Sequence, residues 1–286
     1  MRTHPGEVYV QRRSGYDRAG LGSAGMGVRL PEVARRFLTE QRMLMIGGAD
    51  AAGALWASPL HGPPGFLHAE GERDVLAETV PAAGDPLEGA FTTPNPIGAL
   101  VLEPAGRRRM RVNGTGHEQG GRLVITADQV FANCPKHITR REVHGEADSG
   151  PSAAAADRLS AEQLGLIAAA DTFFIASSAE GHGVDVSHRG GEPGFVLAHD
   201  GMTLSWPEFR GNAMYMTLGN LYVQPRCGLT FVDWTGARPA LRLTGRATVD
   251  WDPVRAADHP GAERMIDFVV DRVVETPGPA LVWRSL

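Results

Sequence analysis

The chain has 286 residues, a formal net charge of −5 and a hydrophobic fraction of 42%. A chain of this length can bury a core without covalent staples, and its two cysteines are too few for a disulfide framework. The acidic balance disfavours generic nucleic-acid binding, and no apolar run of about 18 residues indicates a signal peptide or a membrane span. We therefore expect a cytoplasmic globular protein.

Residues 1–40 predict an N-terminal arm followed by a short helix. The first 30 residues are rich in Gly and Arg and show little apolar periodicity. Within them, Gly20–Gly25 spells a dinucleotide-binding fingerprint, but no buried strand precedes it and no βαβ unit surrounds it, so we set that interpretation aside. Pro31 favours a helix start, and four side chains share one predicted apolar face: Val33, Ala34, Phe37 and Leu38.

Residues 41–130 contain short β-type runs that Gly, Pro and Asn separate. The expected strands are Met43–Ile46, Leu55–Ser58, Phe66–His68, Ile97–Leu102, Arg109–Asn113 and Leu123–Thr126. A dense basic cluster, Arg107 to Arg109 with Arg111, falls at one of these strands. We interpret that cluster as a solvated turn and strand edge.

Residues 131–165 predict a linker. It contains Asn133-Cys134-Pro135-Lys136, and a capping-box pattern at Ser160–Gln163 precedes a helix over Leu164–Ala170. Asn133 and Lys136 have two interpretations, because this motif is either a ligand contact or a capped turn between two units.

Residues 166–286 predict a second set of short strands. These are Phe173–Ser177, Val184–His188, Phe195–Ala198, Thr203–Trp206, Leu229–Asp233, Ala240–Thr244, Ala247–Trp251 and, last, Phe268–Val274. A helix is expected near Ala213–Tyr222, where Met214, Leu218 and Leu221 have helical spacing. Many short strands with few helices predict a mainly β protein built from antiparallel barrels.

The two sets of strands resemble each other. Three markers recur in order at spacings of 129, 130 and 131 residues: Phe66 and Phe195, Gly98 and Gly228, and Gly114 and Gly245. Solenoid repeats are far shorter, so this spacing indicates duplication of one barrel unit. Small barrels often bind ligands at two-fold dimer interfaces, and a tandem copy can form such an interface within one chain.

The stretch Asp185–Phe195, Asp-Val-Ser-His-Arg-Gly-Gly-Glu-Pro-Gly-Phe, is unusually polar for a strand and turn. Glycines allow a ligand to approach the backbone, and Ser187 and Arg189 offer donors to oxygen-rich groups. The alternative is a Gly-rich turn with solvated polar residues.

Four stretches together are similar to one known family. They are Asp185–Val196; Gly211-Asn212 with Thr217-Leu218-Gly219-Asn220-Leu221; Gln224–Leu229; and Asn133–Ile138. The opening His4-Pro5-Gly6-Glu7 also fits. The chain resembles the pyridoxamine 5'-phosphate oxidase-like, FMN-binding split-barrel superfamily, and more closely its tandem-repeat bacterial branch.

This resemblance implies two tandem split β-barrels, with FMN bound where the barrels meet. The cofactor-binding candidates that it implies are Ser177, Asp185, Val186, Ser187, His188, Arg189, Trp206, Phe209, Arg210, Asn212, Thr217, Asn220, Asn133 and Lys136. Two of them keep simpler alternatives, because Arg210 is otherwise a surface charge and Trp206 a core residue.

The chain also departs from the family pattern. Met216 and Thr217 stand where the pyridoxamine oxidases place an Arg-Lys pair for the phosphate, so Arg210, Arg189 or Lys136 must take that role. The pyridoxal-phosphate-binding Arg and His pattern is missing, which argues against vitamin B6 oxidation. In the first half, Leu60-His61-Gly62 occupies the position that matches Arg189, so the first half lacks the corresponding cation. We therefore expect residues of the second half to make most of the flavin site.

The resulting hypothesis is an FMN-dependent oxidoreductase with an unidentified small-molecule substrate. Its electrons would come from NAD(P)H or a separate reductase, and no catalytic acid or base is named. The alternatives are a flavin- or haem-binding carrier or sensor, and a tandem barrel that lost its cofactor and serves as an interaction module. A homodimer is compatible with this class. The histidine spacings complete no known metal site.

Overall fold

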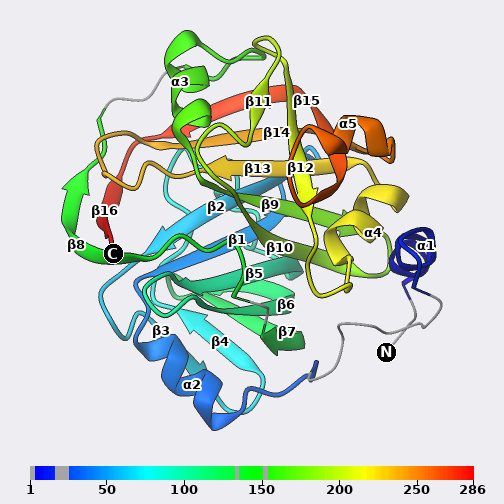
Figure 1. Ribbon diagram of the computed structural model, residues 1–286. Helices are drawn as coiled ribbons and strands as arrows, with labels where there is room; N and C mark the ends of the chain where they lie inside the picture. Colours follow the sequence, from blue (N-terminus) through cyan, green and yellow to red (C-terminus); the bar gives the residue numbers. More distant parts are fainter. Residues whose placement is uncertain (1–3, 17–25, 133–134, 151–153) are drawn as a thin grey trace.

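A computed structural model describes residues 4–16, 26–132, 135–150 and 154–286 (Figure 1). Two seven-stranded antiparallel sheets form most of the molecule, with strand orders β2-β1-β5-β6-β7-β4-β3 and β10-β9-β13-β14-β15-β12-β11. Renumbering the second sheet by its order in the chain reproduces the first sheet strand for strand. The predicted fold class, mainly β with two tandem barrels and few helices, is confirmed.

The strands of the first sheet are β1 (Met43–Ala49), β2 (Leu55–His61), β3 (Leu67–Glu70), β4 (Asp74–Ala77), β5 (Asn95–Glu103), β6 (Arg108–Gln119) and β7 (Arg122–Ala132). Those of the second are β9 (Thr172–Ala179), β10 (Gly183–Gly190), β11 (Leu197–Ala198), β12 (Thr203–Phe209), β13 (Arg226–Phe231), β14 (Ala240–Asp250) and β15 (Ala262–Thr276). A separate ribbon pairs β8 (Arg141–Asp148) with β16 (Pro279–Ser285).

The duplication extends to local irregularities. The register between β6 and β7 shifts at Asn113/Gly114, and that between β14 and β15 shifts at Thr244/Gly245. A Cβ atom would lie 2.0 Å from the Thr126 carbonyl oxygen at Gly114 and 2.1 Å from the Val269 carbonyl oxygen at Gly245. Only glycine fits these bulges, which explains why both markers were recognisable in the sequence.

The two barrels pack against each other reciprocally. A Cβ atom on Gly98 of β5 would lie 2.8 Å from the Asp185 Cα atom in β10, and one on Gly228 of β13 would lie 2.6 Å from the Trp56 Cα atom in β2. Each barrel has its own apolar core, and a third apolar cluster, which includes Met45 and Val186, fills the space between them. The chain therefore contains a pseudo-two-fold interface.

Five helices accompany the sheets in the described residues: α1 (Pro5–Arg13), α2 (Glu32–Thr39), α3 (Ala161–Ala169), α4 (Met216–Val223) and α5 (Pro253–Ala257). In Figure 1, α1 lies beside α4 at the second barrel, whereas α2 lies at the far end of the first barrel. None of the described helices is long and apolar enough to span a membrane.

Several predicted boundaries differ from the structure. The predicted arm contains helix α1, the linker contains strand β8, and the run Phe268–Val274 lies within the long strand β15 rather than being the last strand. Val33 was wrongly placed on the buried face of α2, since it is 73% exposed. Helix α4 starts at Met216, later than predicted, because Ala213 and Tyr215 have left-handed φ angles of 61° and 57°.

Candidate functional site

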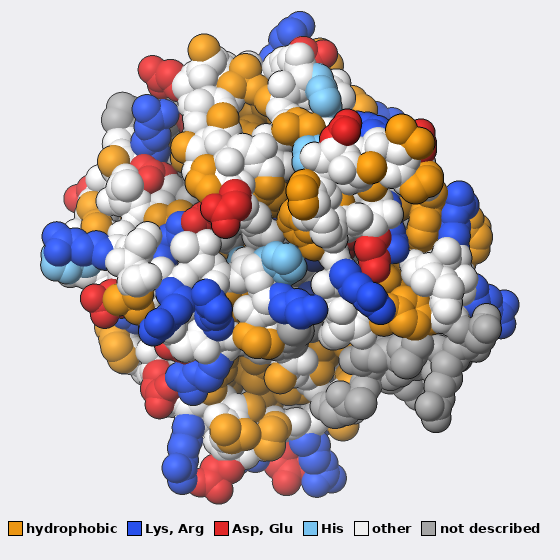
Figure 2. All heavy atoms as spheres, in the orientation of Figure 1, with side chains coloured by type: hydrophobic (Ala, Val, Ile, Leu, Met, Phe, Trp, Pro, Cys, Tyr) orange, Lys and Arg blue, Asp and Glu red, His pale blue; other side chains and the backbone are white. Residues whose placement is uncertain are grey.

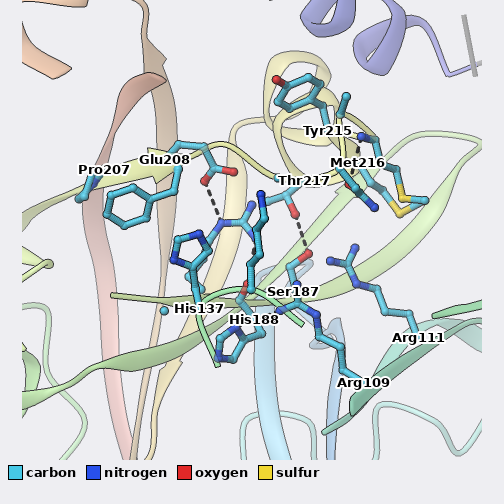
Figure 3. Close-up of a pocket in the computed structure, with 18 of the residues that line it drawn as sticks. Arg109, Arg111, His137, Ser187, His188, Pro207, Glu208, Tyr215, Met216 and Thr217 are labelled. Carbon is cyan, nitrogen blue, oxygen red and sulfur yellow. Dashed lines mark hydrogen bonds and ion pairs between the residues drawn. The ribbon is translucent and has the colours of Figure 1, made fainter. Parts of the chain in front are cut away.

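A pocket opens where the two barrels meet, between strands β6, β10 and β12 and the start of helix α4 (Figure 3). The open space in it, counted to its mouth, is about 830 Å³. Because β6 belongs to the first barrel and the other elements to the second, both repeats are needed to build it.

Cations dominate the pocket wall. Arg109 and Arg111 come from β6, Lys136 from the segment between the repeats, and Arg189 from β10. Arg189 Nε donates to the Glu208 carboxylate at 2.9 Å. Glu208 is the one carboxylate among the described lining residues. Figure 2 shows Lys, Arg and His side chains gathered across the middle of this face. Four cations against one lining carboxylate make the pocket suited to an anion.

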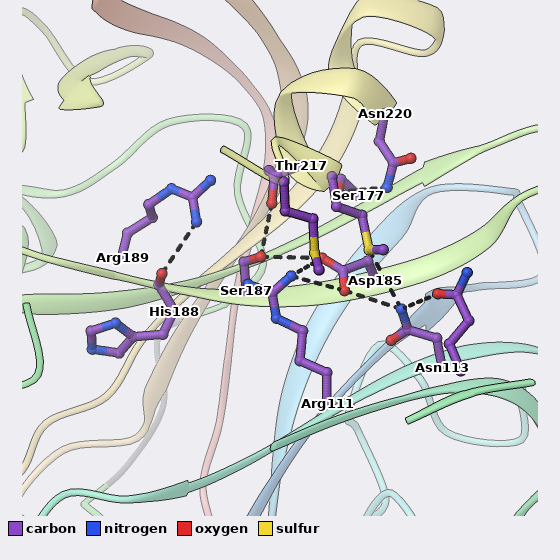
Figure 4. A network of polar contacts seen from close by, with 12 residues as sticks. Arg111, Asn113, Ser177, Asp185, Ser187, His188, Arg189, Thr217 and Asn220 are labelled. Carbon is purple, nitrogen blue, oxygen red and sulfur yellow. Dashed lines mark hydrogen bonds and ion pairs between the residues drawn. The ribbon is translucent and has the colours of Figure 1, made fainter. Parts of the chain in front are cut away.

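A buried polar network supports this wall from behind (Figure 4). Arg111 Nη1 lies 3.0 Å from Asp185 Oδ2, and the Ser187 hydroxyl lies 3.1 Å from the same oxygen. Ser187 and Thr217 share a hydroxyl–hydroxyl hydrogen bond of 2.8 Å. Burial lowers the pKa of Arg111, and the charge of Asp185 opposes that shift. The network thus holds a guanidinium and two hydroxyl groups in fixed positions.

His188 is neutral in this environment. Burial lowers its pKa well below the usual value, and the positive charge of Arg109 adds to the effect. Arg109 Nη1 lies 3.1 Å from His188 Nδ1, and a guanidinium can only donate. His188 Nδ1 therefore accepts, and its ring proton lies on Nε2.

The start of α4 adds backbone donors. Tyr215 occupies the N-cap position with left-handed φ, and no side chain caps the helix. The first-turn N–H groups of an α-helix have no partner within the helix and attract anions. Since Met216 and Thr217 both line the pocket, these donors lie at its wall.

Half of the predicted site residues line this pocket: Ser187, His188, Arg189, Phe209, Asn212, Thr217 and Lys136. Six others lie elsewhere: Ser177, Asp185, Val186, Trp206, Arg210 and Asn220. Asn133 and its neighbour Cys134 lie outside the described residues. The strand and helix start that the resemblance singled out therefore do converge on one pocket.

The residues away from the pocket have identifiable roles. Asn220 is buried and bonds to His4 at 2.8 Å and to Ser177 at 3.1 Å. Trp206 is 1% exposed and packs edge-on against Phe173 with ring centroids 5.0 Å apart, so core packing is its role.

Arg210 also lies away from the pocket lining. Its side chain is 70% exposed and lies 3.8 Å from Glu263. The surface-charge interpretation is therefore the one that the structure favours for Arg210.

Among the lining residues that were not predicted, four carry basic or acidic side chains: Arg109, Arg111, His137 and Glu208. The interpretation of the basic cluster as a solvated turn and strand edge is wrong for Arg111, whose side chain is 9% exposed and ion-paired to Asp185. The available signal was the repeat itself, because Arg111 recurs as Arg242, which also forms a buried ion pair, with Asp85 at 2.9 Å.

The pocket residues fit an anionic ligand that offers hydrogen-bond acceptors. Arg111 Nε and His188 Nε2 are buried donors that have no partner among the described residues, and both side chains line the pocket. Buried donors of this kind are normally satisfied by an acceptor. A ligand that carries a phosphate group and an oxygen-rich ring supplies both negative charge and hydrogen-bond acceptors.

A second pocket occupies the pseudo-equivalent position on the other side of the interface. Four positions of its wall differ from the first pocket: Pro59 replaces His188, Leu60 replaces Arg189, Ala240 replaces Arg109 and Thr79 replaces Glu208. Arg242, the equivalent of Arg111, is held there by Asp85 and by the Ser58 hydroxyl at 3.0 Å. This pocket has lost the counterparts of two cations of the first.

In the described parts of the chain, no three His, Cys, Asp or Glu side chains lie close enough together to hold a metal ion. Cys227 is buried, and burial raises the pKa of its thiol, so this side chain packs in the core as a protonated thiol.

Comparisons with known proteins give similar solved structures only. No family model and no curated protein matches the chain. HupZ of Group A Streptococcus matches at 14% identity over 43% of this chain and 98% of that chain, with a TM-score of 0.35. An FMN-binding protein from Syntrophomonas wolfei matches at 11% identity over 39% of this chain and 80% of that chain, with a TM-score of 0.28.

A NimC/NimA family protein from Clostridium acetobutylicum matches at 12% identity over 43% of this chain and 95% of that chain, with a TM-score of 0.30. Other matches carry names such as pyridoxinephosphate oxidase family protein and F420 reductase. Each of these matches is a likeness of fold over less than half of this chain. At this identity the likeness says nothing of the chemistry of the chain.

Proposed function

We propose that this chain binds FMN in the pocket between its two barrels and acts as an oxidoreductase. One observation carries the proposal: Arg109, Arg111, Lys136 and Arg189 meet the uncapped start of α4 in a single pocket. FMN needs such a setting, because its phosphate is doubly charged and its ring presents acceptor atoms along one edge.

Different pocket residues are suited to different parts of FMN. Arg189, Thr217 and the first-turn N–H groups of α4 are suited to the phosphate, since they combine charge with several donors. Arg111 and Ser187, fixed by Asp185, are suited to acceptor atoms of the ring. Bound FMN supplies hydride or one-electron chemistry, while the protein contributes position and electrostatics.

A cation near the ring also favours the reduced cofactor. Reduced flavin is anionic at its pyrimidine edge, and a fixed guanidinium stabilises that charge without reorganisation. Arg109 and Arg111 are fixed by His188 and Asp185, respectively. This arrangement supports redox turnover more than passive storage, with NAD(P)H or a separate reductase as electron source in the cytoplasm.

Replacement of single arginines tests the site. We expect Arg189→Ala to weaken FMN binding by about 1.5–3 kcal/mol, the value of a charged hydrogen bond, or about 10- to 150-fold in Kd. Arg210→Ala is the matched control, because Arg210 is exposed and outside the pocket lining. Flavin absorbance and mass identification of the released cofactor provide the measurement.

Two outcomes would contradict the proposal. Purified protein that is colourless and takes up no added FMN would exclude the cofactor, and equal retention in both variants would exclude the site. Turnover is tested separately by anaerobic NADPH addition. Bleaching of the flavin band supports an enzyme, whereas tight binding without reduction supports a carrier.

A further inference from the structure

A wide groove lies beside the proposed flavin pocket, on the first barrel. It runs between helix α2 and strands β6 and β7, and its open space is about 1990 Å³. Its floor is apolar and consists of side chains that the fold already buries: Leu30, Ala34, Phe37, Met110, Val130 and Phe131. Figure 2 shows a hollow with hydrophobic side chains on the lower part of this face, with basic and acidic side chains around it.

The rim of the groove is positively charged. Its described lining contains five arginines, at positions 29, 35, 107, 108 and 109, but only two carboxylates, Glu32 and Glu72. Both carboxylates already have cationic partners, since Glu72 pairs with Arg29 at 3.0 Å and Glu32 with Arg36 at 2.6 Å. Arg108 pairs with Glu103 at 2.9 Å and with Glu40 at 3.4 Å, both outside the lining. Arg35 and Arg107 make no ion pair with any described residue, so the surplus of positive charge rests on these two side chains.

The groove and the flavin pocket are neighbours. Arg109 lines both, and its guanidinium lies on the pocket side, where Nη1 is 3.1 Å from His188 Nδ1. Phe131 in the groove packs against Met214 and Met216, which line the pocket. A molecule lying in the groove with one end at Arg109 would reach the edge of the pocket.

We propose that this groove binds an elongated apolar organic anion, such as a long-chain carboxylate, with its anionic end toward the arginine rim. The apolar floor takes the chain by burying it from water, and the surplus of positive charge selects an anion over a neutral molecule. That this anion is the class of substrate presented to the flavin rests on the proposed function above. Continuity with the pocket favours a small molecule over a protein partner.

Binding of dodecanoate to the FMN-loaded protein tests the inference, with dodecanol as the neutral probe of equal length and isothermal titration calorimetry as readout. We expect dodecanoate to bind at least tenfold more tightly than dodecanol. Arg107→Gly removes a rim charge and suits the left-handed φ of 54° at that position. Val33→Asp adds a negative charge at an exposed rim residue. Each variant should weaken dodecanoate binding about tenfold.

Arg226→Ala is the matched control. Arg226 is an exposed residue of strand β13 in the second barrel; its replacement changes the net charge as Arg107→Gly does, but it does not line the groove. Equal affinity for dodecanoate and dodecanol, no binding of either, or equal losses in Arg226→Ala and Arg107→Gly would overturn the inference. Concentration-dependent self-association that dodecanoate does not reverse would also overturn it, because a second copy would then be the occupant.

The flavin itself reports on the neighbouring pocket. Dodecanoate should shift the visible spectrum of bound FMN, and an unchanged spectrum at saturation would overturn the substrate assignment. FMN retention, measured by absorbance in the same variants, separates this result from the proposed function. If the protein binds no FMN but binds dodecanoate more weakly in the rim variants, the proposed groove stands and the proposed cofactor is refuted.

Discussion

At the scale of single residues, Glu7 of α1 links folding to pH. Burial raises the pKa of this carboxyl group to about 7, and the negative charge of Asp185 adds to the shift, while Arg111 opposes it. The folded state thus keeps a proton that the unfolded chain releases near its ordinary value of 4.5. Stability from this group is present below that value and is lost as the pH rises toward about 7.

We therefore expect Glu7→Gln to stabilise the protein at pH 8 and to have little effect at pH 4. The gain at pH 8 should be about 1–3 kcal/mol, because each tenfold change in proton affinity corresponds to about 1.4 kcal/mol and residual solvent exposure reduces the effect. Urea unfolding at the two pH values measures the difference. The same change in stability at both would contradict the assigned burial of the charge.

Residue roles were the hardest feature to predict from the sequence. Ser187 and Arg189 stood out because a polar, glycine-rich strand is unusual. Arg111 did not, because its burial depends on Asp185, which lies 74 positions later and on the other barrel. The exposed Arg210 and the buried Trp206 show the converse, since a motif places a residue near a site without saying which way its side chain points.

At the scale of elements, helix α1 supports the pocket indirectly through α4. The two helices meet at glycines, and a Cβ atom on Gly6 would lie 2.0 Å from the Gly219 carbonyl oxygen. We expect Gly6→Ala to lower stability by about 1–3 kcal/mol, the usual cost of overpacking, and to weaken FMN binding because α4 shifts. Thermal unfolding and FMN titration measure both effects.

A helical glycine without close neighbours provides the control. A Cβ atom on Gly165 of α3 would have no described neighbour within 4 Å, so Gly165→Ala should stabilise the helix by about 0.5–1 kcal/mol. If Gly6→Ala behaves like Gly165→Ala, α1 does not hold α4 in place.

Strands were more predictable than helices and pairings. Short alternating runs bounded by Gly and Pro marked most strands of both sheets, and the bulge glycines marked the repeat. Helix α1 was not predicted because its sequence is largely polar and it contacts α4 through a glycine. The ribbon of β8 and β16 pairs residues such as Arg141 and Ser285. Local sequence patterns do not indicate pairing between residues so far apart in the chain.

At the scale of the whole molecule, the duplicated sheets create two related pockets with different charge. Leu60 and Ala240 stand in the second pocket where Arg189 and Arg109 stand in the first. We expect one FMN per chain in spectrophotometric titration, because the second pocket lacks these two guanidinium groups for a dianionic phosphate. A stoichiometry of two would show that charge does not decide occupancy.

The reciprocal contact through Gly98 and Gly228 has a consequence for how this molecule can change over generations. In an assembly of two identical chains, every mutation appears on both sides of the symmetry axis, so neither cavity can be altered alone. Joining the copies in one polypeptide removes that coupling. One cavity can then stay under selection for its ligand while its twin drifts to a role in holding the halves together.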